Sequence, residues 1–355
     1  MRPITATIDL SALRHNHGVA RRLARGTRVI AVIKANAYGH GVLRAARALS
    51  DADGYAVVEL DAAVRLRELG YGQRIVLLEG FFEPRELAVI AEHKLATVVH
   101  SAEQLDMLRD LPHGAALDVL VKVNTGMNRL GFQPDELAAA LARVRNHRGV
   151  GTVTLMTHFA NADDARGIAW QLETFERVAG SESLPRSLAN SAAILRYPEA
   201  HADSVRPGIM LYGCSPFAES TGADLDLQPV MTLASEIISV RQLARGDSVG
   251  YGGLYTAEGP TRIGVVACGY ADGYPRHAPT GTPVLVGGRL TRTTGRVSMD
   301  MLSVDLSGLD QSRVGTPVVL WGAGNPVENV ASAAGTVGYE LLCALAPRVR
   351  IVEKT

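Results

Sequence analysis

The feature that most limits the fold is a strand-like run followed by a helical segment, recurring eight times in the first part of the chain. The runs are rich in Val, Ile and Leu without strict alternation, which is typical of parallel strands buried on both faces. They lie at residues 28–34, 54–60, 74–79, 95–100, 117–124, 151–158, 186–190 and 204–211. Eight such units in roughly 200 residues predict a (β/α)8 TIM-type barrel, because no Gly-rich GxGxxG turn follows the first run to favour an open doubly wound sheet.

The texture of the sequence changes after about residue 226. Strand-like runs follow one another there with Gly, Pro and Asp turns, and one helical segment begins at Val327. The runs lie at residues 230–243, 262–268, 283–288, 301–306 and 317–321. This pattern predicts a mainly antiparallel β domain, with a boundary in the polar loop near residue 225. The barrel is therefore expected over residues 11–225, where Ser11 caps the first helix, and the β domain over residues 226–355.

Charge and cysteine content exclude several classes of function. Lys+Arg and Asp+Glu both number 36, so no net field attracts nucleic acid or an anionic membrane surface. The three cysteines lie far apart without CxxC spacing, which argues against a disulfide framework and structural zinc. No metal is expected, and the reducing cytoplasm is the simplest compartment. The N-terminal residues lack the pattern of a secretory leader, and no run approaches the length of a membrane span.

Residues at the ends of the predicted strands, most of them polar, are the candidates for chemistry, because barrel enzymes place their active sites at the C-terminal ends of the strands. They are Lys34, Tyr38, Lys122, Asn124, Arg129, His158, Asn190, Ser191, Arg206, Gly208 and Ile209. Each has a structural explanation when taken alone: Lys34 could reach solvent along its stem, and His158 could be a hydrogen-bonded core residue. Their coincidence at one rim favours a functional site.

The last two strand–helix units predict a phosphate site. Ser191 lies at a predicted helix N-terminus, and Gly208 with Ile209 lets the backbone approach a ligand closely. A lysine amine at Lys34, a phosphate site and an arginine together indicate pyridoxal 5′-phosphate, whose aldehyde reacts with lysine. Arg206 would then face the pyridine nitrogen.

The sequence also resembles the bacterial alanine racemases across essentially its whole length. The resemblance rests on AVIKANAYGHG, VKVNTGMNRLGF, THFANAD, LANSAA, RPGIMLYG, VGYGGLYT, GYADGYPR, VSMDM and GYELLCAL, in that order. Loop lengths look closest to the catabolic type. The resemblance implies a cytoplasmic, fold-type III pyridoxal-phosphate enzyme that interconverts L- and D-alanine as a head-to-tail homodimer. It also implies that residues 1–10 join residues 226–355 in the C-terminal domain.

Carried over by position, the resemblance assigns Lys34 as the cofactor lysine and one acid/base, and Tyr251 of the partner subunit as the other. His158 would stack on the cofactor ring and touch Arg206. Cofactor contacts would come from Tyr38, Asn190, Ser191, Gly208, Ile209 and Tyr339. Arg129 would bind the substrate carboxylate, with Met299 and Asp300 of the partner on the substrate side and Tyr270 narrowing the access path. Lys122 is expected to be carbamylated, as in many family members.

Three other functions remain as alternatives. A racemase acting on serine or lysine would need changes around Tyr270, Tyr339 and Met299, and none is evident. A decarboxylase on the same plan would need an acidic partner for the pyridine nitrogen in place of Arg206. A cofactor carrier would resemble the barrel alone and lack Tyr251. Two departures from the family, Asn124 and Cys268, remove no catalytic group.

Overall fold

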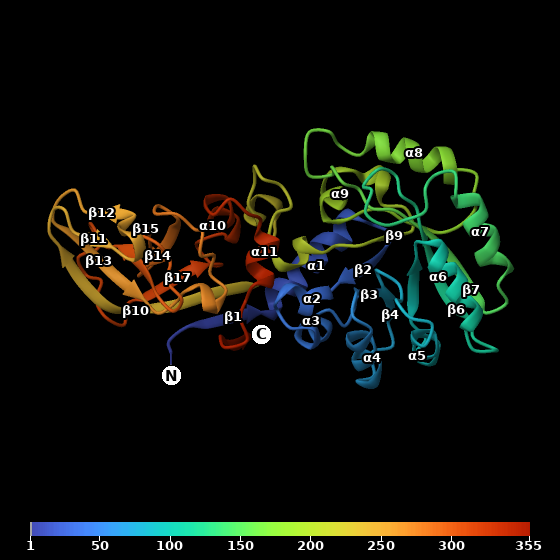
Figure 1. The fold of residues 1–355 in the computed structure, drawn as a ribbon, viewed down its shortest axis with the longest axis horizontal. Helices are drawn as coiled ribbons and strands as arrows, with labels where there is room; N and C mark the ends of the chain where they lie inside the picture. Colours follow the sequence, from blue (N-terminus) through green and yellow to red (C-terminus); the bar gives the residue numbers. More distant parts are fainter. Residues whose placement is uncertain (1) are drawn as a thin grey trace. The chain divides into compact units, whose positions relative to one another are not determined.

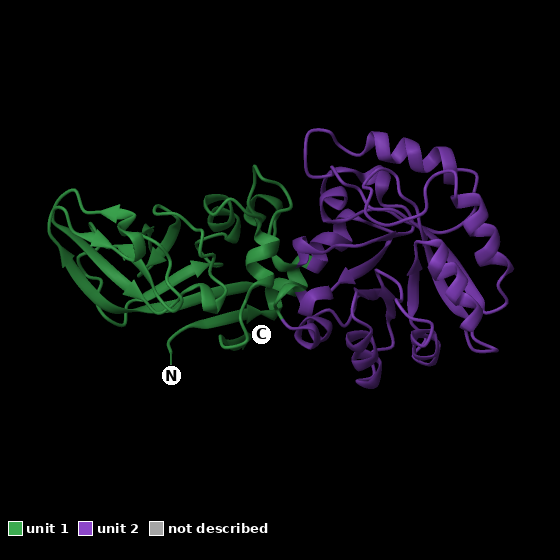
Figure 2. Ribbon diagram, in the orientation of Figure 1, with its two compact units in different colours: residues 1–16, 38–40, 212–355 green, residues 17–37, 41–211 purple. Residues whose placement is uncertain are grey.

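The structure is a computed structural model that describes residues 2–355. Two compact units make up the chain, as Figure 2 shows. Unit 1 holds residues up to Asn16, residues 38–40 and residues 212–355, and unit 2 holds residues 17–37 and 41–211. The boundary near residue 225, expected from composition, stays a prediction.

Unit 2 contains a closed barrel of eight parallel strands, which confirms the predicted fold class. The strands are β2 (Arg28–Val32), β3 (Gly54–Val57), β4 (Arg74–Leu77), β5 (Ala96–Val99), β6 (Leu117–Lys122), β7 (Val150–Met156), β8 (Arg186–Ser187) and β9 (Ser204–Val205). All eight predicted runs contain a strand. Each strand ends before its run does, because the last residues of each run already turn away from the sheet into the loops that follow.

Helices surround these strands in Figure 1. The barrel helices are α3 (Val42–Ala48), α4 (Leu60–Glu68), α5 (Glu86–Glu92), α6 (Ala102–Met107), α7 (Leu137–Asn146), α8 (Ala169–Ala179) and α9 (Ser191–Arg196), with 3-10 turns η1 (Leu108–Asp110), η2 (Pro198–Ala200) and η3 (Ile209–Tyr212). Their apolar faces are buried, as at Leu137, Leu141 and Val144 of α7. Ser101 caps α6, since its Oγ accepts from the Gln104 N–H at 3.4 Å. The predicted cap at Ser11 is wrong, because the first helix begins at Leu10 and Asp9 Oδ1 accepts from the Ala12 N–H at 3.0 Å.

Unit 1 contains an eight-stranded sheet in the order β13-β16-β15-β14-β17-β10-β1-β18. Its strands are β1 (Thr5–Asp9), β10 (Met231–Leu243), β13 (Thr261–Val266), β14 (Pro283–Val286), β15 (Arg289–Thr294), β16 (Leu302–Asp305), β17 (Pro317–Trp321) and β18 (Arg350–Lys354). The long strand β10 pairs with β1 and β17 through its first half and with β13 through its second. All of these pairings are antiparallel, as predicted, apart from the parallel pairing of β1 with β18.

The remaining elements are α1 (Leu10–Leu23), the hairpin β11 (Ser248–Val249) with β12 (Tyr255–Thr256), α10 (Val327–Ala333), α11 (Gly338–Cys343), and the 3-10 turns η4 (Gly222–Leu225), η5 (Tyr251–Gly253) and η6 (Tyr270–Asp272). The five strands and one helix predicted for this part are confirmed. The strands β11, β12, β15 and β18 and the helix α11 were not predicted from the sequence. No helix among residues 2–355 is both long enough and apolar enough to cross a membrane.

Candidate active site

Lys34 is the first residue of a left-handed helical turn directly after β2. The helical turn α2 (Lys34–Tyr38) has φ angles of 51° to 53° at residues 35–38, so it is left-handed. Each L-residue in this conformation costs roughly 1–2 kcal/mol, so four in succession persist only because other contacts hold them. The Gly41 N–H donates to the Asn36 carbonyl at 2.8 Å, and the Val42 N–H donates to Asn36 Oδ1 at 3.0 Å. The side chain of Lys34 is half-buried at this rim.

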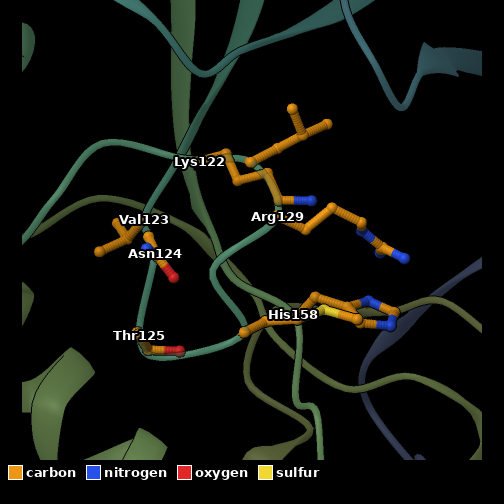
Figure 3. A pocket seen from close by; sticks show the side chains of 8 residues that line it. Lys122, Val123, Asn124, Thr125, Arg129 and His158 are labelled. Carbon is orange, nitrogen blue, oxygen red and sulfur yellow. The ribbon is translucent and has the colours of Figure 1, made fainter.

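Basic groups gather at the same end of the barrel. Lys122 ends β6 and is 6% exposed, and its pKa falls to about 8 because burial removes water and because Arg206, Arg129 and Lys34 add positive charge. The His158 pKa lies well below its usual range, first through desolvation and then through these same cations. Figure 3 shows Lys122, Arg129 and His158 directed to one side of the pocket that they line. His158 is therefore neutral at pH 7, and the cluster favours anionic ligands.

The loop that carries Arg129 is organised by Asn124. Its Oδ1 accepts from the backbone N–H groups of Gly126 and Asn128, at 3.1 and 3.0 Å. Its Nδ2 donates to Asn128 Oδ1 at 2.9 Å. The amide both accepts and donates in this loop, so an asparagine fits this position.

Arg206 is buried directly after β9, and its donors are almost all committed. Nη1 donates to the carbonyl oxygen and Oγ of Ser187 at 2.6 and 2.7 Å, and Nη2 donates to the Thr157 and Leu188 carbonyls at 2.7 and 3.3 Å. A guanidinium has five N–H groups, so the Nε N–H remains for one further acceptor. Burial lowers the Arg206 pKa to about 10, which leaves the side chain protonated at neutral pH.

Residues of the predicted phosphate site meet at the start of α9. Asn190 caps this helix, with its Oδ1 accepting from the Ala193 N–H at 3.0 Å. Ser191 Oγ accepts from the Gly208 N–H at 2.8 Å and from the Met210 N–H at 3.4 Å. The hydroxyl of Ser191 therefore ties the helix start to the segment that contains Gly208 and Ile209. It can also donate its own hydrogen to an oxyanion.

Two further predicted cofactor contacts, Tyr38 and Tyr339, lie in unit 1. Tyr38 is 8% exposed and Tyr339 is 37% exposed, with ring centroids 6.1 Å apart. Tyr38 also stacks on Tyr212 at 4.7 Å. Between Tyr38 and His40, Gly39 has a φ of +81°, and a Cβ there would meet the Leu342 carbonyl oxygen at 2.2 Å. Glycine is therefore required where this segment passes α11.

The remaining predicted residues also belong to unit 1. Tyr270 is the first residue of η6. Two backbone hydrogen bonds join η6 to the segment that contains Met299: the Tyr270 N–H donates to the Ser298 carbonyl at 3.1 Å, and the Ala271 N–H donates to the Met299 carbonyl at 3.0 Å. Asp300 accepts from Arg348 Nη2 at 2.6 Å. Tyr251 opens η5 and is 71% exposed. Unit 1 taken alone leaves this phenol facing solvent.

Two hydrogen-bond networks that support the site were not predicted from the sequence. In the barrel, the fully buried Gln171 donates to Thr125 Oγ1 and to the His158 carbonyl, at 3.0 and 3.2 Å, and so fixes the backbone that carries His158. In the β domain, the buried carboxylate of Asp272 accepts from Arg2 and Arg348. Partners so distant in sequence give no local signal. No group of His, Cys, Asp and Glu side chains in the described chain could hold a metal ion.

Comparison with known proteins gives one consistent family. The alanine racemase N-terminal domain model matches residues 8–216, and the alanine racemase C-terminal domain model matches residues 230–353. An alanine racemase of Nitrosospira multiformis is 60% identical over 99% of both chains, and one of Nitrosomonas eutropha is 56% identical over 98% of both. The crystal structure of a biosynthetic alanine racemase from Pseudomonas aeruginosa superposes with a TM-score of 0.98 at 51% identity, covering 100% of both chains. The chain therefore belongs to the alanine racemase family.

Proposed function

We propose that the chain interconverts L-alanine and D-alanine with pyridoxal 5′-phosphate bound through Lys34. The observation that carries this proposal is the set of basic groups around Lys34 at one end of the barrel. Burial lowers the pKa values of Lys122 and His158, and the positive charges of Arg206, Arg129 and Lys34 lower them further. Such a set suits an anionic cofactor together with a substrate carboxylate.

The donor set fits pyridoxal 5′-phosphate. Lys34 supplies a half-buried amine, and the single uncommitted N–H of Arg206 suits one acceptor such as a pyridine nitrogen. Ser191, Gly208, Ile209, Tyr38 and Tyr339 would hold the phosphate, with Asn190 fixing the start of α9. The neutral ring of His158 would stack on the cofactor. When bound, the cofactor supplies the electron-withdrawing ring that acidifies the Cα–H bond of the amino acid.

Racemisation requires a proton to leave one face of Cα and another to arrive on the opposite face, so two acid/base groups are needed. Lys34 would act on one face and Tyr251 of the partner subunit on the other. Arg129 would hold the substrate carboxylate, while Met299 and Asp300 of the partner would line the substrate side and Tyr270 would narrow access. Arg206 stays protonated because its pKa is about 10, so it donates a hydrogen bond without giving up a proton.

Lys122 is proposed to carry a carbamate. Its pKa of about 8 leaves an appreciable neutral fraction at physiological pH, and only the neutral amine reacts with CO2. The product would be an anion beside Arg129, in place of a cation. Carbon-13 NMR with labelled bicarbonate should show a carbamate signal that grows from pH 7 to pH 8.5 and is absent in Lys122→Met. The same signal in Lys122→Met would contradict the assignment.

The proposal also covers the oligomeric state, the cellular compartment and the domain assignment. We propose a head-to-tail homodimer with shared active sites, because the family resemblance assigns Tyr251 to the active site of the partner subunit and unit 1 taken alone leaves this phenol 71% exposed. A reducing cytoplasm is supported by the three cysteines, none of which forms a disulfide in the described chain. The catabolic type expected from loop lengths stays a prediction, and the Pseudomonas relative is described as biosynthetic. The domain assignment of residues 11–225 to the cofactor and of residues 1–10 with 226–355 to the β domain belongs to this proposal.

Cofactor absorbance tests the proposal directly. Wild-type protein with added pyridoxal 5′-phosphate should show a long-wavelength band that survives gel filtration, because Lys34 links to the cofactor. Lys34→Ala should lose that band, whereas Lys94→Ala, at an exposed lysine of the same unit, should keep it. A band that persists in Lys34→Ala would assign the cofactor to another amine.

A further inference from the structure

The opposite, N-terminal end of the barrel holds an open depression of about 720 Å3 that the proposed reaction does not use. Its lining residues are Arg28, Arg67, Gly72, Arg74, Glu92, His93, Lys94, Asp118 and Thr152. Four of these side chains are cationic and two are carboxylates, so positive charge is in excess by two. A volume in this range is typical of small-molecule sites.

The charge begins inside the barrel itself. Arg28, Arg74 and Asp118 stand at or near the start of β2, β4 and β6, which are alternate strands. Barrel interiors are usually filled by layers of bulky apolar side chains from alternate strands. The next layer follows this rule with Ile30, Val76 and Leu120. The bottom layer does not, because it places two guanidinium groups and one carboxylate where apolar residues would pack.

Protein groups do not satisfy this layer. Arg74 Nε and Nη2 are buried without a hydrogen-bond partner, and the Asp118 carboxylate lies 3.7 Å from Nη2. The other oxygen of Asp118 accepts from the Thr152 N–H and hydroxyl, at 3.3 and 2.6 Å. Burial lowers the Arg74 pKa, the Asp118 carboxylate partly opposes that shift, and the positive charge of the exposed Arg28 lowers the Arg74 pKa further. Asp118 neutralises only one of these two cations, and a buried guanidinium with unused donors beside a second cation is a costly arrangement.

Arg67 adds positive charge at the rim without neutralisation. Its guanidinium donates to four backbone carbonyls, those of Tyr71 and Gln73 at 2.6 Å, His93 at 2.9 Å and Lys94 at 3.2 Å. These carbonyls fix the side chain but carry no net charge. Arg74 remains a quarter exposed, so an edge of its guanidinium reaches the depression.

From these contacts we infer a second ligand site: the N-terminal end of the barrel binds an oxyanion, a phosphate group or a polycarboxylate, between Arg28 and Arg74. Two guanidinium groups offer planar pairs of donors that match the oxygens of such an anion. Lys94 and Arg67 extend the positive field around it, and Glu92 limits the site to one edge of the depression. The site is separate from the proposed cofactor site and does not depend on it.

Calorimetric titration of the cofactor-loaded enzyme with inorganic phosphate tests the inference. Ionic strength is held constant, and saturating racemic alanine occupies the substrate site. Wild-type enzyme should show one saturable site. Arg28→Gln should weaken binding about tenfold, because one charge-assisted contact is lost. Arg177→Gln is the matched control, since it removes the same charge from an exposed arginine of α8 outside the depression, and it should leave the affinity unchanged.

Racemase activity and circular dichroism of Arg28→Gln should equal those of wild type, which separates the new site from catalysis and from folding. Absence of saturable binding to wild type would overturn the inference. Equal phosphate affinity in Arg28→Gln and Arg177→Gln would overturn it as well, because the anion would then sit elsewhere. A selenate soak should place the anomalous scatterer between Arg28 and Arg74.

Discussion

The two proposed acid/base residues differ in how firmly their own chain holds them. Lys34 is half-buried and fixed by a left-handed turn, whereas Tyr251 is 71% exposed on a 3-10 turn next to Gly250. Gly250 and Gly252 have φ angles of +73° and +75°, which suit glycine and shape the loop that presents the phenol. A positioned base must be shielded from water to act efficiently, so Tyr251 needs surroundings that its own unit does not supply.

Replacing Tyr251 by phenylalanine tests its role as a base. Tyr251→Phe removes only the hydroxyl, and racemisation should slow by roughly 10²–10⁴-fold, the usual contribution of a positioned acid/base group. Initial rates from L-alanine and D-alanine should be measured separately. Tyr255→Phe, in the strand that follows the same turn, is the control and should stay near the wild-type rate. Near-normal turnover of Tyr251→Phe in both directions would remove the tyrosine from the mechanism.

At the scale of elements, the left-handed turn α2 is the least expected feature of the barrel. Four successive L-residues with positive φ are held between β2 and α3 by the backbone and side chain of Asn36. Strain of this kind is kept where it places a functional group, and here it sets the direction of the Lys34 side chain.

Substituting Ala35 by glycine should relieve part of that strain. Ala35→Gly removes a left-handed penalty of about 1–2 kcal/mol but adds unfolded-state entropy worth roughly 0.5–1 kcal/mol. Denaturant unfolding should therefore show unchanged or higher stability, while kcat falls because Lys34 is less well positioned. Ala139→Gly, at an exposed alanine of α7, is the control and should destabilise the protein by roughly 0.5–1 kcal/mol. An equal loss of stability in both variants would show that α2 is not strained.

A second element, η6, depends on a buried carboxylate. Both oxygens of Asp272 accept from Arg2, and Oδ1 also accepts from Arg348 Nε at 2.7 Å. Burial alone would raise the Asp272 pKa, but hydrogen bonds from Arg348, the Gly269 N–H and Arg2 outweigh it, and the net pKa is lowered. Because the folded pKa lies below the unfolded one, the stabilisation is present above about pH 4 and is lost as the pH falls through the folded value.

Asp272→Asn should therefore destabilise the protein most at neutral pH. Because Arg2 and Arg348 are partly exposed and stay hydrated, the loss should be that of hydrogen bonds to a charged group, roughly 1.5–3 kcal/mol. The difference from wild type should shrink once the pH drops below about 4. Denaturant unfolding between pH 7 and pH 3.5 measures both effects. Asp310→Asn, at an exposed carboxylate, should change neither. Matching stabilities of the two variants at pH 7 would contradict the role given to Asp272.

At the scale of the whole molecule, a shared active site makes a prediction that no single subunit could satisfy. In a head-to-tail dimer each site takes Lys34 from one subunit and Tyr251 from the other. A dimer of Lys34→Ala with Tyr251→Phe therefore has one site with both groups intact and one site with neither. Random mixing of the two inactive variants should restore about a quarter of wild-type activity, since half of the dimers are mixed. Failure to restore activity after verified subunit exchange would assign both residues to one subunit.

Much of the architecture could be predicted because buried strands leave local runs of apolar residues in the sequence. The eight barrel strands were located from strand-like runs rich in Val, Ile and Leu. The left-handed turn was not predicted, because none of residues 35–38 is a glycine that would indicate a positive φ. Only the nearby Gly39 and Gly41 do so. The strands β15 (RLTRTT) and β18 (RIVEK) consist mostly of polar and charged residues, so their hydrophobic alternation is weak.

In the candidate site, too, some residues could be predicted from the sequence and others could not. Residues at strand ends, such as Lys122 and His158, were predicted because the barrel rule places them at one rim, and their pKa shifts agree with that placement. Supporting contacts were not predictable, because Gln171 and Asp272 meet partners far along the chain. Long-range hydrogen bonds depend on the completed fold and leave no spacing in the sequence. The role of Tyr251 rests on the family resemblance.

The central claim is that this chain moves a proton between the two faces of alanine Cα. The most direct measurement is the optical rotation of L-alanine and, separately, of D-alanine during incubation with purified protein and pyridoxal 5′-phosphate. Decay to zero from both enantiomers is predicted, with slow decay for serine and lysine. Bound cofactor with constant rotation for every amino acid would contradict the account and leave a carrier or a decarboxylase.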